Sequence, residues 1–516
     1  MFGSRSRFQS HSSFVLTLLV YWNILISEFY SIFFYITLMN EAVIAYVQNQ
    51  IAQSKARLTA YAQNSTGKLY PKRNAFIRIE KYIKDFLKGE EEPRWIIVPG
   101  LRGVGKTTIL AQSYLEFVDI SLDSLHILYV SIDEVKNILN ATLKDVIEAY
   151  EQILGVSFEK LEKPILLLID EVQYDEQWAA VLKSLYDRSK KVCVICSGSS
   201  AVSLQSNPDV IRRAVFEKLY PMSFCEFQMI HRNLYQIKDL KKDLKQALYF
   251  SNNAEEAHAR LKLLQPKVLS YWAKVDKFDV QKYLDIGTLP FALRHPNQAQ
   301  VYESINLLLD KIILHDIQTL GKFSAETLSY IKRLLYIMAE TVDILSIEKL
   351  TKILPLDRLT IASIFDVLTK AEMLIKVQAH GSNMSRTTQP AKYYFMTPAI
   401  RLVLLSITGS VGTTLTRQGR LLEDVAALHF YREFIVPGVA GLTYDASSGG
   451  ADFILEVGGS RQLTIEIGTG SKSSTQVKST MDKIKCNYGI VISSDPLLLL
   501  KEENILKVPL PYFLLI

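Results

Sequence analysis

Short apolar runs alternate with amphipathic segments between residues 91 and 230. The runs are rich in Val, Ile and Leu, and longer stretches with helical spacing separate them. Strands that are buried on both faces have this continuous apolar character, and their alternation with helices is typical of a parallel sheet covered by helices. The pattern therefore predicts an α/β domain over residues 91–230. The expected strands are residues 95–98, 126–131, 165–169 and 192–196.

The remainder of the chain divides by the same criteria. Residues 39–90 show helical spacing and lead into the α/β domain. Residues 231–320 are helical and richly charged, as expected of a linker region with solvated helix faces. Residues 321–405 show three helices and a hairpin, which fits a winged-helix domain. Residues 415–516 begin with a helix and continue as short strands between Gly and Ser, which predicts a small α/β domain.

Glycines, a lysine and threonines follow the first expected strand, in "WIIVPGLRGVGKTTIL" (95–110). They complete the pattern G-x-x-x-x-G-K-[ST], in which glycines let backbone N–H groups close around phosphate oxygens. The following helix would point its positive end at the same anion. We interpret the stretch as an ATP phosphate loop rather than an ordinary glycine turn, with Lys106 on the β/γ-phosphates and Thr107 on Mg²⁺. The candidate nucleotide-binding residues are Gly100, Leu101, Arg102, Gly103, Val104, Gly105, Lys106, Thr107, Thr108 and Ser197.

A phosphate loop needs a carboxylate that holds Mg²⁺ at the end of a neighbouring strand. "PILLLIDEVQYDEQW" supplies Asp170 for the metal and Glu171 to polarise the attacking water. The alternative is that the two acids merely cap the next helix. The strand "VCVIC" then ends in "SGSSA", where Ser197 or Ser199 would sense the γ-phosphate, unless this is a simple turn.

Two arginines follow the serine-rich strand tip, in "DVIRRAVFEKL". An arginine at the nucleotide can stabilise transition-state charge from its own chain or from a neighbouring subunit. Arg212 and Arg213 are therefore catalytic candidates, and the alternative is a solvated helix face.

Length and composition indicate several globular domains. The chain has 516 residues, which is too long for one core, with 22% charged and 48% hydrophobic residues. The net charge of +6 permits a nucleic-acid partner without arguing for one. Cys193 and Cys196 form a C-x-x-C motif, but they lie on an expected strand at an odd spacing, so their thiols should lie on opposite faces. We expect buried cysteines rather than a metal or redox pair.

The N-terminus carries an apolar run, residues 14–39, that is long enough to span a bilayer but is interrupted by Asn23 and Glu28. Arginines before the run would send the ATP site outside, away from ATP. We therefore favour a translation start at Met39, with residues 1–38 outside the functional protein, and a cytoplasmic location. A membrane anchor is the alternative.

Four motifs together resemble a known family. In this order, "GLRGVGKTT", "LLLIDEVQ", "SGSSA" and "LYPMSFCEF" look like the prokaryotic AAA-like ATPases that carry a C-terminal domain of unknown function. "YLDIGTLPFAL" (283–293) is similar to the Gly–Pro element of that family, although Thr follows Gly287. The resemblance covers roughly residues 70–500. It implies an AAA-like P-loop ATPase core, then a winged-helix domain, then a restriction-endonuclease-like domain, and it names no substrate.

The winged-helix region gives a mixed signal for DNA binding. A DNA-reading helix usually exposes basic residues, whereas the candidate helix offers Arg358 and Lys370 against Asp357 and Asp366. The expected wing is more basic, so DNA contact through the wing is one interpretation and a packing or protein-contact module is the other. The basic wing residues are Lys376, His380, Arg386 and Lys392.

Three acids in the last domain occupy the positions that a nuclease of this class needs. Glu423 lies on the expected helix, and Asp452 and Glu466 lie on successive strands, where they would hold Mg²⁺. The position of the usual lysine is Gly468, and Lys472 lies four residues further on, from where its side chain would have to reach back. These acids are therefore a candidate second metal site. If no other lysine takes the place of the missing one, the domain is a degenerate nuclease. The alternative is that the three acids are ordinary surface residues.

Two functions follow from these observations. The first is a switch that binds ATP, hydrolyses it with Mg²⁺ and couples its nucleotide state to a protein or nucleic-acid partner, with an oligomer as one possible form. The second is an ATP-dependent nuclease that uses the C-terminal domain. The glycine at position 468 favours the switch.

Overall fold

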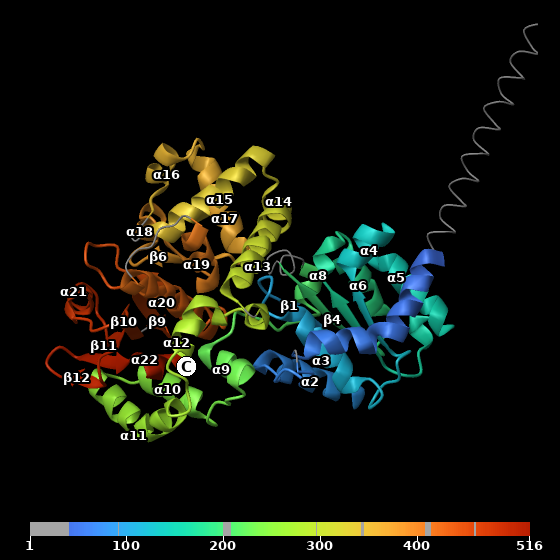
Figure 1. Ribbon diagram of the computed structural model, residues 1–516, viewed down its shortest axis with the longest axis horizontal. Coiled ribbons are helices and arrows are strands. Elements are labelled where there is room, and N and C mark those ends of the chain that lie inside the picture. The colour runs from blue at the N-terminus through green and yellow to red at the C-terminus, as the bar shows by residue number, and fades with distance from the viewer. Residues whose placement is uncertain are drawn as a thin grey trace, which may run out of the picture.

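The computed structural model describes residues 41–516 apart from 65, 91, 200–207, 296, 342–344, 408–413 and 459–460. The apolar run 14–39 and Met39 lie outside the described residues. Two bodies stand side by side in Figure 1, which we define as the N-terminal body (residues 41–220, blue to green) and the C-terminal body (residues 224–516, green to red). Of the helices in the described residues, none is both long and apolar enough to cross a membrane.

A five-stranded parallel sheet forms the centre of the N-terminal body, in the order β2-β3-β4-β1-β5. The first four strands are those expected from the sequence, so that prediction is confirmed. β4 lies between β1 and β3, and the carboxyl ends of all three strands therefore meet at one edge. The strands are β1 (Trp95–Pro99), β2 (Ile127–Ser131), β3 (Ile165–Asp170), β4 (Val192–Gly198) and β5 (Val215–Phe216).

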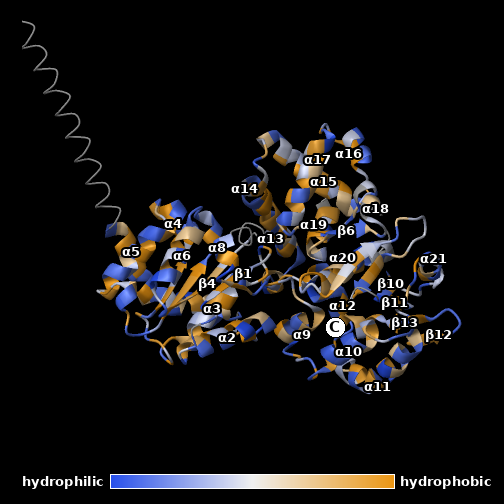
Figure 2. Ribbon diagram, turned by 180° about the vertical axis from the view of Figure 1, so that it is seen from behind, coloured by the Kyte–Doolittle hydropathy of each residue, from blue (hydrophilic) through white to orange (hydrophobic). Residues whose placement is uncertain are grey.

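Helices cover both faces of this sheet, and Figure 2 shows the apolar strands between them. Successive strand residues alternate between two cores: Ile96 packs in one, and Ile97 in the other. Cys193 and Cys196 likewise enter different cores, as predicted, and burial raises the pKa of each thiol to about 12. The covering helices are residues 41–62, α2 (Asn74–Leu87), α3 (Lys106–Phe117), α4 (Ile132–Leu139), α5 (Leu143–Leu154), α6 (Trp178–Arg188) and α8 (Pro208–Ile211).

An eight-stranded mixed sheet forms the C-terminal body, in the order β12-β13-β11-β10-β9-β8-β6-β7. The hairpin expected as a wing is the edge of this sheet, because β6 pairs in parallel with β8 at Gln378–Thr443 and Ala379–Tyr444. The predicted domains 321–405 and 415–516 therefore share one sheet, in which each strand covers an edge that would otherwise be unpaired. The strands are β6 (Leu374–Ala379), β7 (Lys392–Phe395), β8 (Ala440–Tyr444), β9 (Phe453–Val457), β10 (Arg461–Ile467), β11 (Tyr488–Ser493), β12 (Leu498–Leu500) and β13 (Ile505–Pro509).

The helices expected as a linker region pack onto the same sheet. α11 contacts β12 and β13, and the Tyr488 hydroxyl of β11 donates to the carbonyl oxygen of Leu248 in α10 at 2.6 Å. Residues 240–272 are therefore part of the C-terminal body. The helices of this body are α9 (Phe224–Arg232), α10 (Leu240–Tyr249), α11 (Ala254–Trp272), α12 (Asp279–Lys282), α13 (Gln298–Lys311), α14 (Gln318–Gly321), α15 (Ala325–Glu340), α16 (Ile347–Ile353), α17 (Arg358–Lys370), α18 (Asn383–Thr388), α19 (Pro398–Ile407), α20 (Thr414–Phe430), α21 (Thr475–Lys483) and α22 (Leu510–Leu514).

Candidate functional site

The glycine loop after β1 has the backbone that phosphate binding requires. Gly105 adopts φ 101° as the residue before α3, which is left-handed backbone that favours glycine. A Cβ on Gly100 would lie 2.2 Å from the carbonyl oxygen of Leu219, so this position also needs glycine. Lys106 is buried over the loop, and its Nζ donates to the carbonyl oxygens of Gly100 (2.9 Å) and Leu101 (3.3 Å).

The strand-tip acid Asp170 is held by hydroxyl groups. The Thr107 hydroxyl donates to its Oδ2 at 2.7 Å, the Tyr129 hydroxyl donates to the same oxygen at 3.2 Å, and the Ser197 hydroxyl donates to its Oδ1. Burial, and next the neighbouring Glu171, raise the pKa of Asp170. Ser197 thus contacts Asp170, the predicted metal ligand. Ser199 lies two residues further along the chain and contacts Asp316 of the C-terminal body instead.

Glu171 lies directly after the strand in left-handed backbone (φ 56°), which is unusual for a residue with a side chain. Its N–H donates to the Ser197 hydroxyl at 3.3 Å, and the Gln173 amide donates to its carboxylate. Burial opposes the charged form, but Lys106 and Arg102 outweigh it, so the pKa of Glu171 is lowered. The carboxylate is therefore ionised beside the loop.

A carboxylate of the C-terminal body reaches this site. Asp316 accepts two hydrogen bonds from the Arg102 guanidinium of the loop, at 2.9 and 2.8 Å, and both side chains are under 10% exposed. The Ser199 hydroxyl donates to Asp316 at 3.1 Å, and Arg102 Nη1 lies 3.7 Å from Glu171. Asp316 lies in a π-helical turn, residues Ile312–Ile317, between α13 and α14, and such turns occur frequently at functional sites.

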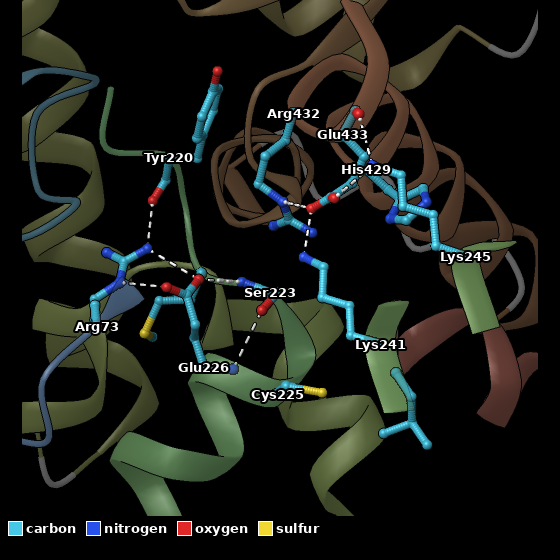
Figure 3. Close-up of polar contacts among 12 residues, drawn as sticks. Arg73, Tyr220, Ser223, Cys225, Glu226, Lys241, Lys245, His429, Arg432 and Glu433 are labelled. Atoms are coloured by element: carbon cyan, nitrogen blue, oxygen red, sulfur yellow. Dashed lines mark hydrogen bonds and ion pairs between the residues drawn. The ribbon is translucent and has the colours of Figure 1, made fainter. Parts of the chain in front are cut away.

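Arg73 joins the loop to the C-terminal body from the other side (Figure 3). It donates to the carbonyl oxygens of Val104 in the loop (2.8 Å) and Tyr220 (2.9 Å), and it binds both oxygens of Glu226 at 2.9 and 3.1 Å. Burial opposes the charged form of Glu226, but Arg73 lowers its pKa to about 2. Ser223 and Glu226 also form the capping box of α9, which accounts for the "SFCE" part of the motif.

Neither Arg73 nor Asp316 was indicated by the sequence. Both act through contacts between residues more than 150 positions apart in the chain. Helical spacing places Asp316 on a helix but gives no sign that the carboxylate faces the phosphate loop.

The two arginine candidates after the strand tip lie away from this edge. β5 pairs in parallel with β1 at Ile96 and Ile97, so residues that precede β5 lie toward the amino end of β1. Arg213 is held there by Asp187 (3.1 Å) and Asp209 (3.6 Å), and Arg212 is exposed beside it. The expected action on the nucleotide of the same chain is therefore corrected by the strand direction. A role toward a neighbouring copy stays a prediction.

The loop and its surroundings fit Mg-ATP. Gly103 and Gly105 have the left-handed backbone that glycine favours, and Gly100 packs too closely against Leu219 to carry a Cβ. Thr107 and Asp170 bring two oxygen ligands together, and oxygen ligands are what Mg²⁺ prefers. Lys106, Arg102 and the start of α3 supply positive charge for the phosphates.

The three acids of the predicted second site line one cavity of about 260 Å³ in the C-terminal body. The N–H of Asp452 donates to Glu466 Oε2 at 3.3 Å, and Lys472 Nζ donates to Glu466 Oε1 at 2.8 Å. Lys472 therefore contacts the acid that Gly468 leaves without a lysine neighbour. A second ammonium group, that of Lys392 in β7, lies 3.5 Å from Asp452.

These carboxylates are not a preformed set of metal ligands. Burial, and next Asp452, raise the pKa of Glu423 to about 8 and that of Glu466 to about 7. Within the described parts of the chain, no group of three or more His, Cys, Asp or Glu side chains is arranged to hold a metal ion. The expected ligand set Glu423, Asp452 and Glu466 is thus corrected. The three acids share a cavity, but ammonium groups of the described residues contact only Glu466 and Asp452, and burial favours the neutral form of Glu423.

Most basic residues of the expected wing face acids of their own sheet. Glu456 binds both His380 (3.2 Å) and Arg386 (3.1 Å), and Lys392 lies beside Asp452. Lys376 is the exposed exception on β6. Few basic side chains of the wing therefore remain without an acidic partner, which weakens the predicted DNA contact through the wing.

The parallel sheet, the glycine loop after β1 and the acid pair at the carboxyl end of β3 define an AAA-like P-loop ATPase. Residues 92–228 match a family described as AAA domain, and residues 277–410 match a domain of unknown function (DUF8612). The chain belongs to the same family as the uncharacterized protein MJ1637 of Methanocaldococcus jannaschii, to which it is 35% identical over 473 residues, or 91% of this chain and 93% of that protein.

More distant similarities are narrower. An uncharacterized protein of Haemophilus influenzae is 27% identical over 157 residues, which is 30% of this chain and 38% of that protein. A Walker-type ATPase of Pyrococcus abyssi superimposes with a TM-score of 0.38 at 12% identity, over 66% of this chain and 97% of that one. The ORC1 protein of Aeropyrum pernix, solved in complex with DNA, gives a TM-score of 0.30 at 12% identity, over 66% and 93%.

Proposed function

We propose that the protein hydrolyses ATP with Mg²⁺ and passes the nucleotide state to its C-terminal body. The observation that carries the proposal is the buried pairing of Asp316 in that body with Arg102 in the phosphate loop. Because Arg102 belongs to the loop and its partner to the C-terminal body, a change in what the loop binds can alter the contact between the two bodies.

Each residue of the site has a role in this proposal. The loop residues Gly100–Thr108 bind the phosphates, with Lys106 at the β/γ-phosphates, and Thr107 and Asp170 hold Mg²⁺. Bound Mg²⁺ supplies positive charge that neutralises the phosphate oxygens. Glu171 orients the attacking water and accepts its hydrogen bond, and its ionised state supports this role. Ser197 positions Asp170 through its hydroxyl group.

The coupling step is an exchange of partners by Arg102. With ATP bound, Arg102 turns from Asp316 toward the γ-phosphate, and Asp316 keeps only the Ser199 hydroxyl. A buried carboxylate that loses its cation is destabilised, so the helix around it shifts. The hydrolysed state restores the pair. Gln173, which contacts both Glu171 and Ser199, links the base to the same exchange.

The output of the switch is a contact with a protein or nucleic-acid partner through the C-terminal body, in the cytoplasm, where ATP is available. The AAA class to which the chain belongs makes self-association part of this proposal. Arg212, exposed at the opposite edge of the sheet, is the residue that a neighbouring copy would meet.

Two variants of the full chain test the ATPase proposal. Lys106→Ala should abolish ATP binding, whereas Glu171→Gln should bind ATP with unchanged affinity and slow turnover by roughly 10²–10⁴-fold, the usual contribution of a general base. ATP binding by calorimetry and phosphate release measure the two effects. Full turnover in Lys106→Ala protein would sink the proposal.

An ATP-dependent nuclease is the second candidate function, and one contact favours it. Lys472 Nζ lies 2.8 Å from Glu466, in a cavity that Glu423 and Asp452 also line. A lysine next to such an acid can orient an attacking water even though it comes from outside the usual position. Mg²⁺ would enter here only by displacing ammonium groups from the carboxylates, which keeps this function second to the switch.

Incubation with Mg²⁺ or Mn²⁺, ATP and several DNA and RNA forms tests the nuclease. Cleavage that disappears in both Glu466→Ala and Lys472→Ala would establish it. Absence of cleavage under every condition, with ATP turnover intact, would leave the switch alone.

A further inference from the structure

A cavity of about 470 Å³ lies between the N-terminal and C-terminal bodies, apart from the nucleotide site. Its walls come from the start of α2, the segment 216–220, the start of α9, α10 and the π-helical turn Tyr431–Ile435. Five cationic side chains and three carboxylates line it, and one of the five cations, Lys218, is paired with Glu372 outside the cavity. The cavity therefore has an excess of positive charge in a partly buried place, where such an excess is costly without an anion.

The carboxylates on these walls are already engaged. Glu226 is bound by Arg73, and Glu217 by Arg78 at 2.7 Å. Glu433 accepts from three cations: Lys241 at 2.6 Å, Arg432 at 3.0 Å and Lys245 at 3.2 Å. One carboxylate cannot neutralise three cations, so the surplus charge is concentrated where Figure 3 shows Arg432 and Lys241 converging.

Arg432 has unused donors at this point. Its side chain is only 14% exposed, and its Nε donates to Glu433. Among the described residues, no acceptor is hydrogen-bonded to Nη1 or Nη2, so these donors are available to an anion in the cavity that Arg432 lines. Burial, and next the like charge of Arg432, lower the pKa of Lys241, which is what two crowded cations produce.

We propose that this cavity binds a phosphate group, with Arg432 and Lys241 as its ligands. The fork of an arginine matches two oxygens of a phosphate, and a lysine adds a point charge. A bound oxyanion would neutralise the positive charge that Glu433 alone cannot balance. Arg73 lines the cavity and also donates to the carbonyl oxygen of Val104 in the phosphate loop. A single side chain would therefore connect the bound anion to the ATP site.

Two sources can present this chemistry: a free phosphate or polyphosphate, and the backbone of a nucleic acid. The probes are inorganic pyrophosphate, followed by calorimetry, and a fluorescent single-stranded oligodeoxynucleotide, followed by anisotropy. The Lys106→Ala full-length protein is the starting material, because the phosphate loop would otherwise compete for pyrophosphate.

Lys241→Met is compared with Lys242→Met on that background. Lys242 is the next residue of the same helix and is exposed, so both variants lose one positive charge and only one loses a cavity ligand. We expect at least a tenfold weaker binding of one probe in Lys241→Met and no change in Lys242→Met. Loss confined to pyrophosphate identifies a free ligand, and loss confined to the oligonucleotide identifies a nucleic-acid phosphate.

Arg432→Lys keeps the charge but removes the fork, and it should weaken the same probe while the thermal midpoint without ligand stays close to that of the parent. Equal binding of both probes by the parent, Lys241→Met and Arg432→Lys would overturn the proposal. So would an equal loss in Lys241→Met and Lys242→Met, because this would reflect net charge alone. Residual loop binding would affect all variants alike, so it cannot imitate the expected difference.

Discussion

The nucleotide site and the C-terminal cavity each contain acids and a lysine, but they hold the acids differently. In the nucleotide site, hydroxyl groups of Thr107 and Ser197 bind Asp170, while Lys106 bonds to backbone carbonyls. In the C-terminal cavity, ammonium groups contact the acids directly, as Lys472 does with Glu466.

This difference separates a site that is prepared for a cation from one that is not. A carboxylate whose hydrogen-bond donors are neutral hydroxyl groups has no cationic partner that a metal ion must displace. A carboxylate paired with lysine has its charge already balanced, and a metal ion must displace that partner. This difference supports the proposal that Mg²⁺ binds in the first site, whereas its entry into the second would require Lys472 and Lys392 to move.

The largest expected effect is on the acids themselves. Asp170→Ala should slow ATP turnover by roughly 1,000-fold, or about 4 kcal/mol, because it removes the carboxylate that we propose as a ligand of Mg²⁺. Asp452→Ala, the matched change in the other cavity, should leave ATP turnover within twofold of the parent. Comparable losses in the two variants, with both proteins folded, would erase the distinction between the sites.

Next in size is the pair that joins the nucleotide site to the C-terminal body. Asp316→Asn leaves a buried Arg102 without its main partner and should lower the free energy of unfolding by about 3 kcal/mol. The double variant Arg102→Met, Asp316→Asn should recover most of that loss, since no unpaired charge remains. Urea unfolding of the two single variants and the double variant gives the coupling energy. Additive losses would contradict the proposed pairing.

Local motifs and long-range contacts differ in how far the sequence predicts them. The strand before Gly100 and the helix after Lys106 follow from a continuous apolar run and a fixed spacing, so the loop and the acids after β3 could be predicted. The role of Asp316 could not be predicted, because helical periodicity does not indicate that a residue 214 positions away in the chain contacts Arg102.

The strand pairing between the predicted winged-helix and last domains could not be predicted for a related reason. Pairing of β6 with β8 joins residues that are 65 positions apart, and each strand alone looks like part of its own local unit. Lys472 is an intermediate case: the sequence marks it as a substitute for the missing lysine, and only the fold brings its Nζ to Glu466.

A smaller effect, which depends on pH, tests the ion pair of Arg73 and Glu226, the second contact between the two bodies. The lowered pKa of Glu226 means that its pair with Arg73 stabilises the fold above pH 4.5, the ordinary pKa of the group, and that this stabilisation is lost as pH falls toward about 2. Glu226→Gln should cost about 2–3 kcal/mol at pH 7 and progressively less below pH 4.5. Denaturant unfolding at pH 7, 5, 4 and 3 measures the difference, and a cost that does not change with pH would contradict the assigned ion pair.

The smallest effect concerns the lysine of the C-terminal cavity. A Cβ on Gly468 would lie 2.2 Å from Cε of Lys472, so Gly468→Ala should push this flexible side chain off Glu466. Lys472 is 32% exposed but Glu466 only 2%. Loss of the ion pair should cost about 1 kcal/mol, because the pKa of Glu466 is already raised to about 7 and the acid can take up a proton instead. Thermal unfolding measures the cost, with Lys472→Met as the reference variant. A loss of several kcal/mol would mean that the glycine is required by the backbone rather than by the lysine.

Hydrogen exchange of residues 312–321, with and without ATP, tests whether the nucleotide site is coupled to the C-terminal body. The measurement uses Glu171→Gln protein, which is expected to hold ATP without turning it over. The account predicts that ATP speeds amide exchange around Asp316, because Arg102 leaves it, and that Asp316→Asn protein exchanges fast in both states. Identical exchange of this segment in the two states, with ATP binding verified, would contradict coupling between the nucleotide site and the C-terminal body.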